Sequence, residues 1–168
     1  MSRNIACVFF VSVLFLLAGC MSSPYYQKEY AIPKNAWAYN FRPSFKFEIT
    51  DTNSLYNLYF VIRHTDAYPY SNIWLMVYTK KPGDSTFEAT RLEIPLAEPS
   101  GKWLGRGMGE IWEQRMPISV AGDKKMLRTK GVWEIRIEQN MRSNPLPDVM
   151  QVGLRAEKAE TSTFKSQP

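Results

Sequence analysis

Two apolar runs in the middle of the sequence predict a pair of buried β-strands. Leu58 to Ile62 and Ile73 to Val77 are apolar, aromatic or β-branched at successive positions. Such runs are typical of strands that are covered on both faces. The polar segment between them contains Pro69, which suits a turn and interrupts a strand, and also the single histidine, His64. We therefore expect residues 56–79 to form the central hairpin of a β-domain, with His64 in its turn.

Alternating apolar and polar positions predict further strands on both sides of this hairpin. Residues 45–49, 92–96, 132–138 and 150–156 each alternate with a period of two, as half-buried strands do. Lys81-Pro82-Gly83-Asp84 is a strong turn signal between two of them. These segments give a series of short strands separated by turns.

The remaining segments complete an all-β pattern. We expect Ile118 and Val120 to belong to a short strand, and Glu110 to Arg115 to form a single helical turn. No stretch has the period of a long amphipathic helix. About seven or eight strands at this spacing predict a single antiparallel β-sandwich, either jelly-roll or immunoglobulin-like.

The first twenty residues have the pattern of a bacterial lipoprotein signal peptide. Arg3 precedes an apolar run of about 14 residues, which is shorter than the roughly 20 needed to span a bilayer as a helix. Leu17-Ala18-Gly19-Cys20 then follows the lipobox pattern, in which small residues precede the cysteine. We expect cleavage before Cys20 and lipidation of its sulfur, which anchors the protein in a membrane.

The sequence divides into four parts around one folded domain. We expect a signal peptide at 1–19, the lipidated cysteine and a polar tether at 20–36, a β-sandwich at 37–157 and a disordered tail at 158–168. About 149 residues remain after cleavage, which is enough for one domain with its own core.

Charge and cysteine content exclude several classes of function. The net charge of +5 is scattered, and the longest basic clusters are pairs such as Lys80-Lys81, whereas nucleic-acid binding requires a basic stripe or block. We therefore expect no nucleic-acid partner. Cys7 leaves with the signal peptide and Cys20 is acylated, so the mature domain has no thiol for a disulfide, a metal or a nucleophile.

The sequence also contains no complete catalytic set. His64 is the only imidazole and no Gly-x-Ser-x-Gly motif exists, so we interpret His64 as a hydrogen-bonded turn residue and not as a base. Gly105 to Gly109 precedes no Lys-Ser/Thr pair and is read as a loop that needs positive φ. The pattern singles out no glycosidase pair among the available carboxylates, Asp51, Glu93, Glu98, Glu110, Glu113 and Asp148. We expect no enzyme activity, cofactor or metal.

Several motifs resemble the gliding motility lipoprotein GldH family of the Bacteroidetes. They follow one another in order over nearly all of the mature domain. They are the Leu-Ala-Gly-Cys lipobox, Asp51-Thr52 with Leu55-Tyr56-Asn57-Leu58, Ile62-Arg63-His64-Thr65 with Tyr68-Pro69-Tyr70-Ser71-Asn72, Gly101-Lys102-Trp103-Leu104-Gly105 with Gly109-Glu110-Ile111, and Gln139-Asn140-Met141-Arg142 with Pro145-Leu146-Pro147 and Val152-Gly153-Leu154-Arg155.

The resemblance implies a non-enzymatic lipoprotein of the cell envelope that serves gliding and the type IX secretion apparatus. Its partners would be envelope proteins of that apparatus. Met21-Ser22-Ser23 lacks the acidic residues that act as retention or surface-export signals in similar lipoproteins, so we expect the outer membrane, with the domain facing the periplasm.

The matched motifs also suggest which residues bind a partner. Those that fall in predicted turns or loops are not explained by strand packing, and they are His64, Tyr68, Tyr70, Trp103 and Arg142. The alternative is a membrane-anchored carbohydrate-binding module. A row of exposed aromatic rings on one concave face would favour the sugar, whereas an apolar patch with a polar rim would favour a protein partner.

Overall fold

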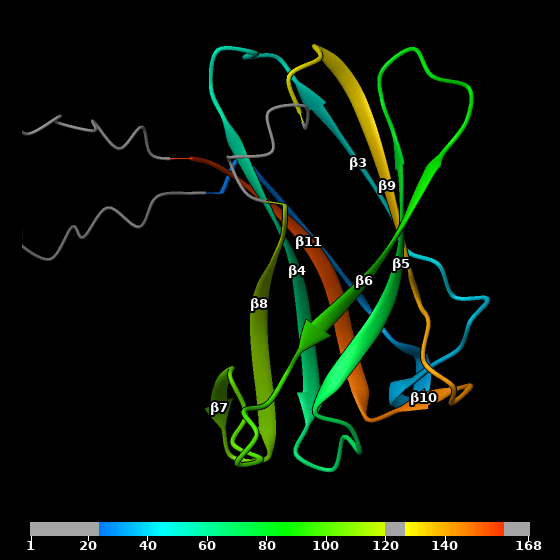
Figure 1. Cartoon of the computed structure of the whole chain (residues 1–168), viewed down its shortest axis with the longest axis vertical. Coiled ribbons are helices and arrows are strands. Elements are labelled where there is room, and N and C mark those ends of the chain that lie inside the picture. The colour runs from blue at the N-terminus through cyan, green and yellow to red at the C-terminus, as the bar shows by residue number, and fades with distance from the viewer. Residues whose placement is uncertain (1–23, 120–126, 160–168) are drawn as a thin grey trace, which may run out of the picture.

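A computed structural model describes residues 24–119 and 127–159 of the chain, and this part is built of β-strands (Figure 1). The strands are antiparallel, so the predicted all-β antiparallel class is confirmed. None of the described segments is a helix long and apolar enough to cross a membrane. The elements are β1 Tyr26–Ala31, the short 3-10 helix η1 Pro33–Asn35, β2 Ala36–Trp37, β3 Ser44–Ile49, β4 Tyr56–Thr65, β5 Asn72–Lys80, β6 Glu88–Pro95, β7 Arg106–Met108, β8 Ile111–Ser119, β9 Gly131–Gln139, β10 Leu146–Pro147 and β11 Val149–Lys158.

The described strands form three sheets. A five-stranded sheet has the order β1-β11-β4-β8-β7, a four-stranded sheet has the order β3-β9-β5-β6, and β10 pairs with β2 in a two-stranded ribbon. The prediction of one sandwich did not include this third sheet. Its strands are only two residues long, and the ribbon buries Trp37 and Leu146, which are opposite each other in register.

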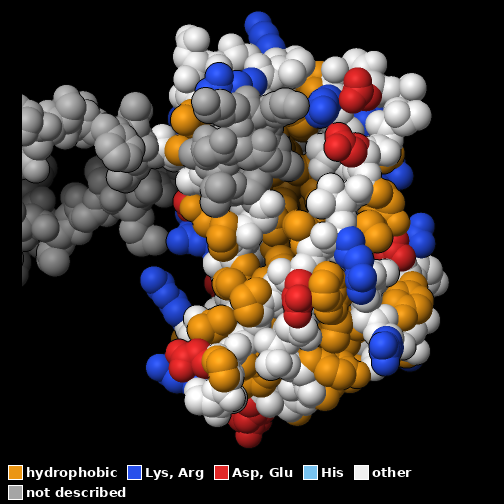
Figure 2. Space-filling model, viewed as in Figure 1, with side chains coloured by type: hydrophobic (Ala, Val, Ile, Leu, Met, Phe, Trp, Pro, Cys, Tyr) orange, Lys and Arg blue, Asp and Glu red, His pale blue; other side chains and the backbone are white. Residues whose placement is uncertain are grey.

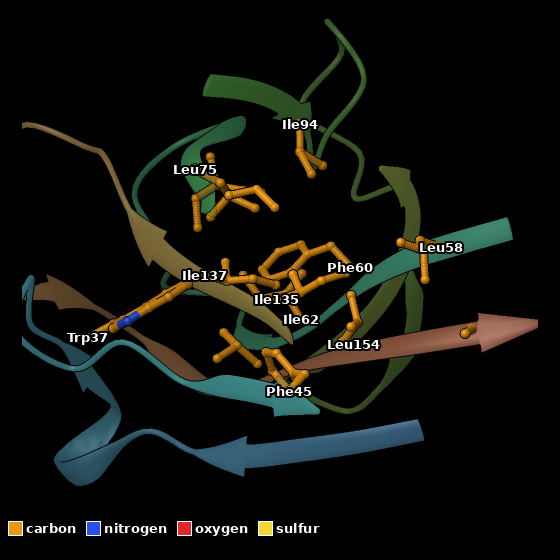
Figure 3. Close-up of a cluster of buried hydrophobic side chains, with 14 of the residues drawn as sticks. Trp37, Phe45, Leu58, Phe60, Ile62, Leu75, Ile94, Ile135, Ile137 and Leu154 are labelled. Atoms are coloured by element: carbon orange, nitrogen blue, oxygen red, sulfur yellow. The ribbon is translucent and has the colours of Figure 1, made fainter. Parts of the chain in front are cut away.

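Buried side chains from both larger sheets form one core (Figure 3). Phe60 and Leu154 come from the five-stranded sheet, and Leu75 and Ile135 come from the four-stranded sheet; all four are fully buried. Burying each such side chain stabilises the fold by about 1.5–3 kcal/mol. On the face drawn in Figure 2, hydrophobic side chains also gather along the middle, in the region where Figure 1 draws β6 and β8.

The predicted central hairpin of residues 56–79 is wrong, because its two strands lie in different sheets. β4 lies between β11 and β8, whereas β5 lies between β9 and β6. The connecting residues 66–71, which include Pro69, carry the chain from one sheet to the other, and stacked sheets are about 10 Å apart. Each apolar run therefore forms a central strand of its own sheet, and local order in the sequence did not determine the pairing.

Two further segments differ from the sequence expectations. Residues 110–115 were expected to form a helical turn, but Ile111 to Ser119 is strand β8, in which Trp112, Gln114 and Met116 are the less exposed positions. Within the expected tether, residues 26–31 form β1, which pairs with β11 along its whole length. The aromatic rings of Tyr26 and Tyr30 in β1 pack against the core, which explains why this segment is ordered into the sheet.

Strand register places the β7–β8 turn at one end of the five-stranded sheet, opposite the end where the chain enters the domain. At the entry end, Tyr26 is opposite Ala156 and Tyr56 is opposite Lys158. At the other end, Thr65 is opposite Ile111. Figure 1 shows the same arrangement, with the described ends of the chain close together at the upper left and β7 at the bottom. We call the end that carries β7 the distal end.

Candidate functional site

Four of the five predicted partner-binding residues meet in one aromatic cluster at the distal end. The His64 ring centroid lies 4.6 Å from that of Trp103 and 5.3 Å from that of Tyr68. The Tyr70 ring is edge-on to Tyr68 at 5.8 Å. Because His64 is the last but one residue of β4 while Trp103 lies in the loop between β6 and β7, the cluster joins elements that are far apart in the sequence.

His64 is fully buried in strand β4, so its expected place in a turn is wrong. Its Nδ1 lies 2.7 Å from the Thr65 carbonyl oxygen, which accepts a hydrogen bond and so puts the ring proton on Nδ1. The Gln114 amide nitrogen donates to the Leu96 carbonyl oxygen at 2.6 Å and lies 3.4 Å from Nε2 of His64. Burial lowers the pKa of His64, which keeps the imidazole neutral. This is the arrangement of a structural histidine and not of an accessible base.

The two tyrosines and Trp103 cover this histidine to different degrees. Tyr68 is buried, its hydroxyl donates to the Asn72 carbonyl oxygen at 3.0 Å, and burial raises its pKa. Trp103 is half-buried and packs against the core. Tyr70 is also half-buried, and its hydroxyl is hydrogen-bonded to the Ser143 side chain. Of the cluster, Trp103 and Tyr70 are therefore the side chains with accessible surface.

Arg142 does not join the cluster. Its side chain is exposed, and it precedes Ser143, the partner of Tyr70, in the segment after β9. It is the one predicted partner-binding residue whose side chain is exposed. The structure thus brings His64, Tyr68, Tyr70 and Trp103 together and leaves Arg142 beside them.

The sequence interpretation missed an exposed apolar pair next to this cluster. Met108 in β7 is 85% exposed and lies opposite Ile111 in β8, which is 38% exposed. We call these two side chains the distal tip. An aliphatic residue between glycines, as in Gly107-Met108-Gly109, is a sequence signal for a projecting loop, but the expected helical turn hid its pairing with Ile111. Gly107 is required here because a Cβ would lie 2.8 Å from the Trp112 ring.

A groove of about 660 Å³ runs from the loop before β7 across the outer face of the five-stranded sheet. Charged and amide side chains dominate its lining, together with Val61, Leu104 and Met116. Over residues 24–119 and 127–159, no group of three or more His, Cys, Asp or Glu side chains is placed to hold a metal ion. The charged lining is Arg106, Glu113, Arg115, Arg155 and Glu157, and the amides are Gln27 and Gln114.

The exposed large hydrophobic side chains are aliphatic throughout the described part of the chain. They are Leu104, Met108, Ile111 and Val132. A platform for sugar rings would need a row of exposed aromatic rings, whereas an apolar patch beside charged groups fits a protein partner. Of the two alternatives, the described surface therefore favours the protein partner.

Comparison with known proteins agrees with the family resemblance that the sequence motifs suggested. The profile of a family described as GldH lipoprotein matches residues 24–156. The chain is 27% identical over 158 residues to a gliding motility lipoprotein GldH homolog of Christiangramia forsetii, an alignment that covers 90% of this chain and 94% of that protein. It is also 27% identical over 139 residues to the gliding motility lipoprotein GldH of Flavobacterium johnsoniae, covering 79% and 84%. Residues 1–19, Cys20, Val120 of the expected short strand and residues 160–168 of the expected tail 158–168 lie outside the described residues, whereas Lys158 is the last residue of β11.

Proposed function

Because this chain belongs to the GldH lipoprotein family, we propose that it is a lipid-anchored, non-enzymatic accessory component of the gliding motility and type IX secretion machinery. Cys20 would carry the lipid, in the outer membrane, with the domain facing the periplasm. The names of the two relatives support the link to gliding. The buried, neutral His64 and the lack of a thiol in the mature chain support a role in binding and not in catalysis.

One observation supports the docking role most directly: Met108 is 85% exposed at the end opposite the one where the chain enters the domain. Met108 lies beside Ile111, and adjoining exposed apolar side chains support an interaction site. The entry end leads to Cys20, so a domain anchored there would present the distal tip away from the membrane. An envelope protein of the machinery would then contact Met108 and Ile111.

In this proposal some of the predicted partner-binding residues contact the partner, and the others support the loop that does so. Trp103, Tyr70 and Arg142 have accessible surface near the distal end and would lie at the margin of the contact. His64 and Tyr68 are buried beneath Trp103 and would hold its loop in place. Aromatic and arginine side chains such as Trp103, Tyr70 and Arg142 commonly contribute most of the binding energy at protein interfaces.

A deletion strain tests the proposal. Loss of the protein should reduce surface spreading and the export of secreted proteins, and the wild-type chain should restore both. Met108→Glu combined with Ile111→Glu should fail to restore them, because two charges would replace the apolar contact. Val132→Glu is the matched control, since Val132 is 55% exposed but lies opposite Glu48 in the other large sheet. Full restoration by the double variant would contradict docking at the distal tip, and an unaffected deletion strain would contradict the role itself.

A further inference from the structure

The groove continues from the distal tip along the same face of the five-stranded sheet. Arg106 and Met108 are two residues apart in β7, and Glu113 and Ile111 are two residues apart in β8, so all four side chains point to one side. Register then extends this side to Arg63 in β4, opposite Glu113. The surface beside the apolar tip is therefore charged.

The carboxylates of this surface already form ion pairs with arginines of the protein. The Glu157 Oε1 atom accepts from both Arg115, at 2.9 Å, and Arg155. Glu113 is paired with Arg63. The other Arg155 hydrogen bond is to the amide oxygen of Gln27. Every acidic side chain that lines the groove thus has an arginine partner within the protein.

The arginines, by contrast, have N–H donors that no group in the described part of the protein accepts from. Each guanidinium carries five N–H donors, and Arg115 uses one of them on Glu157 while Arg155 uses two. Arg106 is exposed, and its guanidinium forms no ion pair or hydrogen bond with any described residue. The groove therefore offers many charge-assisted donors and few acceptors, which suits a ligand rich in carboxylate oxygens.

The spacing of these arginines suggests the shape of the ligand. Arg106, Arg115 and Arg155 lie on β7, β8 and β11, and β4 separates the last two strands. At about 4.8 Å per strand, the first and last arginines are roughly 14 Å apart across the sheet. Register also offsets them by four residues along it, because Arg106 is level with Glu113 and Arg155 is level with Pro117. The backbone positions therefore lie on a diagonal of roughly 20 Å, the length of about six residues of extended chain. Alternate side chains of such a chain point the same way, about 7 Å apart.

We propose that this groove binds an extended acidic segment of a protein partner, with one carboxylate facing Arg106 and another facing Arg115 and Arg155, whose guanidinium groups meet at Glu157. The intervening side chains would contact Val61 and Leu104, which also line the groove. A sugar polymer would need aromatic rings, which the lining lacks. The inference deepens the proposed docking role by giving the chemistry of the partner.

A binding measurement on the purified full chain in detergent tests this inference. The probe is a fluorescein-labelled six-residue peptide of alternating glutamate and valine, followed by fluorescence anisotropy. Binding should weaken with added salt. Arg106→Gln and Arg155→Gln should each raise Kd about tenfold, as expected for one lost charge-assisted contact. Arg128→Gln is the matched control, because Arg128 is exposed and lies outside the groove, and it should leave Kd unchanged. Since Arg106 has no internal partner, its replacement should also leave the melting temperature unchanged.

Three competitors give outcomes that would overturn the inference. Equal binding of the peptide with glutamine in place of glutamate would exclude carboxylate recognition. Displacement by polygalacturonate at a lower carboxylate concentration would identify an acidic polysaccharide instead, and displacement by millimolar inorganic phosphate would identify a simple anion site. Failure of peptide binding while the tip variants still fail to restore motility would overturn this inference alone and leave the proposed function standing.

Discussion

Burial of His64 has a consequence for stability that pH can reveal. Its folded pKa lies below the ordinary value of 6.5, so below that pH the unfolded chain takes up the proton more readily than the folded chain does. The free energy of unfolding should therefore be highest above pH 6.5 and fall as pH decreases toward the folded pKa, by up to about 1.4 kcal/mol per pH unit.

His64→Phe isolates this contribution, because it keeps a ring against Trp103 but cannot titrate. The variant should be less stable than the wild type at pH 7, since the Thr65 carbonyl loses its partner. The gap should narrow between pH 7 and pH 5 in urea unfolding curves. Parallel pH profiles for the two proteins would show that the folded state protonates His64 without cost.

Replacing Trp103 tests whether its ring supports the fold or contacts a partner. Its ring lies 4.6 Å from His64 and 6.3 Å from Tyr68, so its removal would expose both. We expect Trp103→Ala to lower the free energy of unfolding by about 2 kcal/mol, less than a fully buried tryptophan. Met108→Ala is the control and should change stability by less than about 0.5 kcal/mol. A variant that keeps full stability but loses partner binding would instead make Trp103 a contact residue alone.

Among the elements, β1 depends on the absence of a side chain in the neighbouring strand. A Cβ on Gly153 in β11 would lie 2.5 Å from Glu29 Cγ and 2.8 Å from the Lys28 carbonyl oxygen, so β1 would have to move. We expect Gly153→Ala to cost about 1–3 kcal/mol and to speed amide hydrogen exchange in residues 26–31. Gly107→Ala, at the distal end, should leave exchange in β1 unchanged. Equal exchange in β1 for the Gly153→Ala variant would show that the close approach is relieved elsewhere.

For the whole molecule, lipidation at Cys20 determines where the domain lies. Cys20→Ala should move the protein to the soluble envelope fraction and abolish palmitate labelling, because the acyl chains supply the membrane affinity. Cys7→Ala is the matched control, since Cys7 precedes the predicted cleavage site and should leave both readouts intact. Labelling that persists in the Cys20→Ala protein would refute the anchor.

The face of the membrane is a separate prediction. With the domain facing the periplasm, protease added to intact cells should spare it, whereas cells with a permeabilised outer membrane should lose it. Rapid digestion in intact cells would place the domain on the surface. Residues 98–102, which are all exposed and lie between β6 and β7, are a suitable place to look for the first cleavage.

The sequence by itself determined the positions of several strands, the all-β class and the family. Phe45 to Ile49 and Trp133 to Ile137 alternate as expected, and both are strands with the apolar residues buried. The strands could be predicted because alternation of apolar and polar residues shows which face of a strand is buried, and this does not depend on which element packs against that face. The motifs that resembled the GldH family likewise needed no fold, and the family assignment is confirmed.

Only the tertiary structure decided which strands pair and which side chains are left in water. It separated β4 from β5, buried His64, turned residues 111–119 into a strand and left Met108 exposed. It also gathered Arg106, Arg115 and Arg155, which are distant in sequence, on one face. The physical reason is that alternation shows that a face is covered but not by which strand, and pairing depends on packing between segments far apart in the chain.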